Sequence, residues 1–71
     1  MSLPAGMATL TDARRALEVR WEQLRRTWDD AAAQRFEETF IRPMDEDLRR
    51  AIHAMGQVQE VARRAHRDCN V

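Results

Sequence analysis

Apolar residues recur at alternating steps of three and four through most of the chain, which is the period of one face of an α-helix. In the first half, this series is Leu10, Ala13, Leu17, Trp21, Leu24, Trp28 and Ala31. β-Branched residues are scattered and do not alternate with polar ones, so the pattern predicts no strand. Ala, Arg, Leu, Glu and Gln, which are good helix formers, dominate the same stretch. The sequence therefore predicts an all-α protein.

The second half carries a more regular apolar series with the spacing of a heptad repeat. Its members are Met44, Leu48, Ala51, Met55, Val58, Ala62, Ala65 and Cys69. A stripe of this kind is typical of helices that pack side by side at a shallow angle. On this pattern we expect Leu48 and Met55 to lie in a core, and Arg49 and Arg50 to lie in solvent.

Pro43 marks the predicted boundary between two helices. Proline suits the first turn of a helix, where its missing N–H is not needed, and it disfavours helical geometry at Arg42. A turn at Arg42 and Pro43 gives one helix over 10–41 and another over 43–69, nearly equal in length. The prediction is an antiparallel two-helix hairpin.

A second turn position, at Trp28-Asp29-Asp30, stays open. There Thr27 could cap the next helix, with Asp30 three residues further on. This choice leaves a short helix packed against a much longer one that contains Pro43. The matching of helix lengths favours the turn at Pro43.

The predicted domain covers residues 9–71, preceded by a flexible leader over 1–8. The leader contains Ser, Pro and Gly, and the Thr9 hydroxyl is the predicted helix cap. A chain of 71 residues has room for one small domain.

The charge balance argues against several classes of partner. Twelve arginines cancel twelve acidic residues, so no net field attracts nucleic acid or an anionic membrane. The basic residues of the first half alternate with acidic ones and read as a solvated mixed face: Arg14, Arg15, Arg25 and Arg26. No apolar run approaches the roughly 18 residues of a membrane span, and the first ten residues do not resemble a signal peptide. We expect neither a nucleic-acid nor a membrane partner.

No residue pattern points to catalysis or to a cofactor. His66 and Cys69 share a helix face, but a metal site needs three or four ligands, and His53 is distant. The Glu-x-x-His motif of di-iron bundles is missing, so Glu37 and Glu38 are expected to be solvated or ion-paired. We therefore expect no catalytic residue, metal, cofactor or small-molecule substrate. Cys69 could be a free thiol or could form an intermolecular disulfide.

The segment Trp28-Asp29-Asp30-Ala31-Ala32-Ala33-Gln34-Arg35-Phe36 resembles the centre of the small Trp-X-Gly helical hairpins of type VII secretion systems. In that family a tryptophan begins the turn, a glycine follows two residues later, and an aromatic residue often lies eight residues after the tryptophan. Trp28 and Phe36 match in type and spacing. Asp30 stands in place of the glycine, and the chain has no tyrosine for the family's export signal.

The resemblance implies a hairpin that pairs into a four-helix homodimer or heterodimer. It also implies a role as a secreted partner, export chaperone or adaptor. The location would be the cytoplasm, or outside the cell after export without a cleavable signal peptide.

The apolar residues are more numerous than one helix–helix contact needs, so we expect the hairpin to pair into a four-helix bundle. The candidate interface residues are Trp21, Trp28, Phe36, Phe40 and Ile52. The expected partner is a second copy or a similar hairpin. The predicted function is that of a non-enzymatic protein–protein interaction module. The alternatives are a type VII-like secreted partner, and a regulatory coiled-coil subunit of a larger enzyme or DNA-binding complex.

Overall fold

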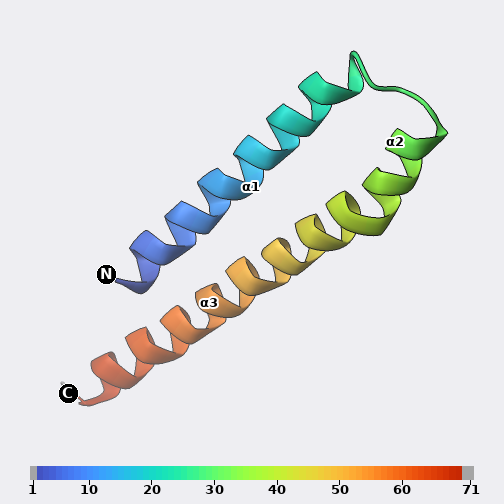
Figure 1. Cartoon of the computed structure of the whole chain (residues 1–71). Coiled ribbons are helices and arrows are strands. Elements are labelled where there is room, and N and C mark those ends of the chain that lie inside the picture. The colour runs from blue at the N-terminus through green and yellow to red at the C-terminus, as the bar shows by residue number, and fades with distance from the viewer. Residues whose placement is uncertain (1, 70–71) are drawn as a thin grey trace.

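The computed structural model describes residues 2–69 as two helical arms that lie antiparallel (Figure 1). The first arm is α1 (Leu3–Arg25). The second contains α2 (Ala31–Phe36), the π-helical turn η1 (Glu37–Ile41) and α3 (Arg42–Cys69). Helical dihedral angles at both junctions make this second arm one continuous rod. The described part of the chain is therefore an all-α hairpin, as the apolar pattern predicts.

The chain reverses at Arg26–Asp30, so the predicted turn at Arg42 and Pro43 is wrong. The amides of Thr27 and Trp28 both donate to the carbonyl of Leu24, which tightens the end of α1. The two arms are consequently unequal, because 23 residues form α1 and the rod occupies the whole range Ala31–Cys69. Equal helix lengths did not predict the turn correctly, because α1 packs along only part of the longer second arm.

Asp30 makes this turn possible without glycine. Its backbone is extended, with φ −119° and ψ −175°, a conformation open to any residue. Its carboxylate Oδ1 accepts a 2.9 Å hydrogen bond from the amide of Ala33, which caps α2. Among residues 2–69 no residue has a positive φ, so the loop nowhere requires a glycine.

Pro43 lies inside the rod because the turn before it is a π-helix. In a regular α-helix the proline ring would clash with the carbonyl four residues earlier. Here the amide of Arg42 instead reaches back five residues to the carbonyl of Glu37. This wider turn makes room for the ring, and the helix continues without a break.

α1 begins earlier than the sequence suggested. Ser2 is the N-cap, and its hydroxyl accepts a hydrogen bond from the amide of Ala5. Pro4 occupies the first turn, where no N–H is needed. Thr9 does not cap a helix, because its hydroxyl donates to the carbonyl of Ala5 within α1. Residues 3–8 of the predicted leader are therefore helical, whereas Met1, Asn70 and Val71 lie outside the described residues.

The arms meet along a seam whose register is fixed by a few contacts. Arg14 pairs with Asp45 at 2.7 Å near the middle of the hairpin. Close to the N-terminus of α1, a Cβ added to Gly6 would lie 3.1 Å from Cε of Met55. The absence of a side chain at Gly6 thus lets the Met55 side chain pack directly on the α1 backbone.

The predicted heptad seam is divided between two faces of α3. Leu48 and Met55 are half-buried, and Arg49 and Arg50 are exposed, as expected. Met44 and Val58, however, are exposed, and Ile52 is half-buried instead. The face of α3 that meets α1 is therefore rotated away from the centre of the heptad stripe.

α3 is longer than the arm it packs on. The hairpin measures 60 × 17 × 14 Å, and the last turns of α3 continue past the N-terminus of α1 (Figure 1). Glu60 is the last half-buried residue, and every residue from Val61 to Cys69 is exposed. We call residues 61–69 the overhang.

Candidate interaction surface

Four aromatic side chains form one cluster next to the turn. The ring centroid of Trp21 lies 6.0 Å from that of Trp28 and 5.5 Å from that of Phe36. Trp28 and Phe36 are 5.9 Å apart, and Phe40 adds to the cluster at 5.1 Å from Phe36. The turn thus brings together four of the five interface candidates named from the sequence. Ile52 lies far along α3, half-buried in a groove that Met7 also lines.

The cluster explains why the chain reverses before Phe36. A straight helix would hold Trp21 and Phe36 about 22 Å apart, given 1.5 Å of rise per residue. The turn instead brings the two rings into contact, which removes most of the Trp21 side chain from water. Trp21 is 8% exposed and Ala33 is fully buried, and these are the buried apolar residues of the described chain. Trp21 is thus part of the hairpin's own small core, whereas Phe36 and Phe40 remain exposed.

Polar groups hold the buried indole in place. The Nε1 of Trp21 donates a 2.6 Å hydrogen bond to Oε1 of Glu37, and Arg42 pairs with Oε2 of the same carboxylate at 3.1 Å. The indole hydrogen bond, with help from Arg42, lowers the pKa of Glu37 below its ordinary 4.5, although partial burial opposes the shift. Glu37 therefore stays ionised and acts as the acceptor that a buried indole requires. No local sequence signal links Trp21 to Glu37, so this contact was not predicted.

Arg25 lies over the ring of Trp21. Its guanidinium lies 5.9 Å from the ring centroid, within the range of a cation–π contact. Its Nη2 donates to Asp29 at 2.7 Å, so the same side chain also ties the end of α1 to the turn. Arg25 therefore belongs to the turn structure and is not available as a free basic group.

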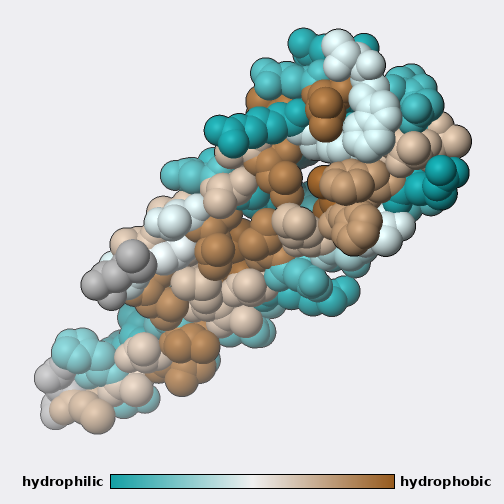
Figure 2. Space-filling view, in the orientation of Figure 1, coloured by the Kyte–Doolittle hydropathy of each residue, from teal (hydrophilic) through white to brown (hydrophobic). Residues whose placement is uncertain are grey.

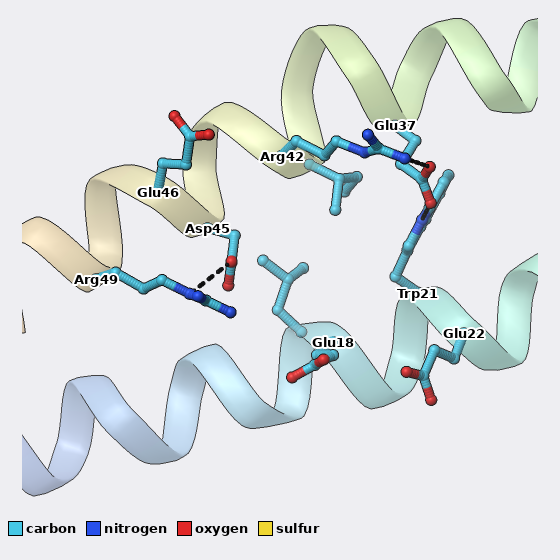
Figure 3. Close-up of a pocket in the computed structure, with 10 residues that line it drawn as sticks. Glu18, Trp21, Glu22, Glu37, Arg42, Asp45, Glu46 and Arg49 are labelled. Atoms are coloured by element: carbon cyan, nitrogen blue, oxygen red, sulfur yellow. Dashed lines mark hydrogen bonds and ion pairs between the residues drawn. The ribbon is translucent and has the colours of Figure 1, made fainter.

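One side of the hairpin is polar, and a groove of about 390 Å³ runs along it (Figure 3). Carboxylates line it from both arms, including Glu18 and Glu22 on α1 and Glu46 on α3. Asp45 also lines it and is paired with both Arg14 and Arg49. Figure 3 views the hairpin with α1 below α3, the reverse of Figure 1, so this groove lies on the far side of Figure 1.

The opposite side carries a stripe of exposed apolar residues that runs over both arms. Each helical residue turns the chain by about 100°, which places the stripe roughly opposite the charged groove lining of α3. We call it the apolar flank and define it as Leu24, Phe36, Phe40, Met44, Ala51 and Val58. Phe40 is 55% and Met44 is 45% exposed. Figure 2 shows apolar side chains in a nearly continuous band along the long axis, with hydrophilic ones on both sides.

The described residues offer little else that could form a site. No three His, Cys, Asp or Glu side chains within residues 2–69 gather closely enough to hold a metal ion. Cys69 is a free, exposed thiol at the end of the overhang. None of the described helices has the length and apolar character of a membrane-spanning segment.

The apolar flank is therefore the main candidate site, and its nature is that of a contact surface. No family model, curated protein or solved structure is significantly similar to the chain.

Proposed function

We propose that this chain is a non-enzymatic interaction module, a helical hairpin that associates with a second copy of itself through the apolar flank. The observation that carries the proposal is the excess of exposed surface. The chain exposes 5665 Å², whereas a compact monomer of 8.3 kDa would expose about 4,600 Å². The difference, about 1,100 Å² per chain, is similar to the roughly 800 Å² that each partner buries in a typical stable interface.

The shape of the hairpin leads to the same conclusion. Its radius of gyration is 17.2 Å, compared with about 11 Å for a globular chain of this length. Two helices share one line of contact, so each can bury only one side. Large apolar groups such as Phe40 and Val58 consequently remain in water, which small monomeric proteins rarely tolerate in a continuous patch.

A second copy is the partner that the composition favours. The chain has twelve basic and twelve acidic residues and no net charge, so two copies do not repel each other strongly. A two-fold axis needs only one kind of surface, provided that this surface is complementary to itself. Pairing two flanks would join the arms of both hairpins into a helical bundle and enlarge the minimal core around Trp21 and Ala33.

Two matched valine variants test this proposal by sedimentation equilibrium at micromolar concentration. Val58 lies on the apolar flank and is 59% exposed, whereas Val19 lies on the outer side of α1 and is 52% exposed. Val58→Glu should convert a dimer into a monomer, because pairing would bury an unpaired carboxylate. Val19→Glu adds the same charge elsewhere and should leave the dimer unchanged. A wild-type chain that is monomeric and folded at these concentrations would refute the proposal.

A type VII-like secreted partner is a second candidate function, supported by the position of the turn. The reversal at Arg26–Asp30 overlaps the start of the segment that resembles the Trp-X-Gly hairpins, and Trp28 contacts Phe36 at the other end of this segment. The test is to express the chain in a strain that has a type VII system. Recovery from the culture filtrate, lost when the secretion ATPase is inactive, would support this role. Retention in the cells would count against it.

A further inference from the structure

The overhang and the aromatic end of the apolar flank are two exposed surfaces, and they lie towards opposite ends of one rod. Most of the overhang continues past the N-terminus of α1, and it exposes Val61 together with Ala62 and Ala65. Phe40 and Met44 are exposed at the turn end of the same rod. Small residues on one segment and large ones on the other allow close packing between the segments. They are too far apart to meet within one chain, but they can meet between two chains that run in opposite directions.

The charges of the rod are also divided between its two ends. Residues 37–48 contain five carboxylates and one arginine, whereas residues 49–69 contain five arginines and two carboxylates. A parallel pair of rods would place like charges side by side along the whole length. An antiparallel pair places the acidic part of each rod beside the basic part of the other, which favours encounter and fixes direction.

Asp47 gives a local reason for the same direction. It lies on the side of α3 that carries Met44 and Ala51, and its side chain is 74% exposed. Its contact with Arg50 is long, at 3.4 Å, so the carboxylate is not strongly paired within the chain. Two parallel rods in register would bring both Asp47 carboxylates together at the interface, where like charges destabilise association. Antiparallel rods keep them apart and place each beside the start of the partner's overhang.

We propose that two copies pair with their α3 helices antiparallel and crossing near Ala54, so that the overhang of each covers Phe40 and Met44 of the other. This arrangement rests on the proposed self-association and specifies its geometry. Ala54 lies midway between Phe40 and Asp68, which is the centre required if each overhang is to reach the aromatic end of the partner. The two hairpins are then offset lengthwise, each extending beyond the other at its turn.

The native cysteine provides a direct test, because Cys69 is the single cysteine of the sequence and can be labelled selectively. Spin labels on Cys69 should be about 45 Å apart in the antiparallel dimer. In each chain Cys69 lies fifteen residues beyond the crossing point at Ala54, and the two cysteines lie on opposite sides of it, so about thirty residues of helix rise at 1.5 Å each separate them. In a parallel dimer they would lie within about 20 Å, because neighbouring helix axes are only 8–10 Å apart. Pulsed electron–electron double resonance measures both ranges. The labelled dimer is first verified by sedimentation.

A second label fixes the crossing point. Gln57 is exposed on the side of α3 away from the apolar flank, so a label there should not disturb the interface. In a Cys69→Ser background, labels at Gln57→Cys should lie within about 30 Å of each other if α3 crosses near Ala54.

The outcomes separate this arrangement from the proposed function on which it rests. A dimer with the long Cys69 distance and the short Gln57 distance supports the arrangement. A dimer with a short Cys69 distance, or with both distances long, overturns it while leaving self-association intact. A chain that sediments as a monomer overturns both.

Discussion

Trp21 and Glu37 lie on different arms, sixteen residues apart in sequence, and are joined by a 2.6 Å hydrogen bond from the indole to the carboxylate. The bond falls where α1 meets the first turn of η1. It satisfies the N–H of a nearly buried indole in a protein that buries very few side chains. Each arm holds one partner, so the bond also fixes how the arms are rotated relative to each other.

The first prediction is that this contact makes stability depend on pH in the acid range. The pKa of Glu37 is lowered below 4.5 in the folded chain, mainly by the Trp21 hydrogen bond. Its contribution is therefore present above the unfolded pKa and is lost as the pH falls through the lowered folded pKa. Glu37→Gln should lower the melting temperature at pH 7 and should match the wild type more closely at pH 3.

Circular dichroism melts at one protein concentration measure this effect, because association makes the melting temperature depend on concentration. Glu38→Gln is the control, since Glu38 is exposed and accepts a hydrogen bond from the exposed Gln34 on the same arm. A difference between Glu37→Gln and wild type that persists unchanged at pH 3 would contradict the prediction.

The second prediction concerns the fully buried Ala33. Its exposed fraction is 0%, so a larger side chain has no free volume to occupy. Ala33→Leu should cost about 1–3 kcal/mol through overpacking. Ala32→Leu makes the same change at the adjacent exposed position and should stay within about 0.5 kcal/mol. Urea denaturation followed by tryptophan fluorescence compares the two, and equal effects would mean that Ala33 is not enclosed.

The third prediction compares the two aspartates of the turn. Asp30 caps α2 through the amide of Ala33, so Asp30→Ala should cost about 1 kcal/mol. Asp29 makes only an exposed ion pair with Arg25, so Asp29→Ala should cost less than about 0.5 kcal/mol. The same denaturation experiment ranks the variants. A reversed order would show that the ion pair, and not the cap, holds the turn.

The helical class and the inward side of α3 could be predicted because both depend on local periodicity. Leu48 and Met55 recur at the spacing of one helix face, and exposed Arg49 and Arg50 lie between them in sequence. Periodicity could not show that one part of the heptad stripe packs against α1 while the other part stays exposed. Which part of a broad stripe meets α1 depends on how the arms are rotated, and that rotation is fixed by distant pairs such as Trp21 and Glu37.

The position of the turn does not follow from Pro43, because the clash that proline causes applies to a regular α-helix. The π-helical turn before Pro43 removes this clash, and no residue pattern in the segment predicts a π-helix. The aromatic cluster also depends on contacts between residues distant in sequence. By contrast, the start of α1 could have been predicted, because Ser2 followed by Pro4 is a normal helix beginning.

The last prediction is that Pro43 is tolerated in the rod at a cost, and that its removal stabilises the hairpin. Proline in a regular helix interior is about 3 kcal/mol less favourable than alanine, but the π-turn already relieves the ring clash, so the remaining cost at Pro43 is mainly one missing backbone hydrogen bond, worth about 0.5–1.5 kcal/mol. Pro43→Ala should therefore raise the free energy of unfolding by about 1 kcal/mol and give residue 43 an amide protected from hydrogen exchange. Pro4→Ala is the matched control, because Pro4 lies in the first turn of α1 and should change stability by less than about 0.5 kcal/mol. A loss of stability in Pro43→Ala would contradict the prediction and would mean that proline is needed to maintain the π-turn between the contacts at Glu37 and Asp45.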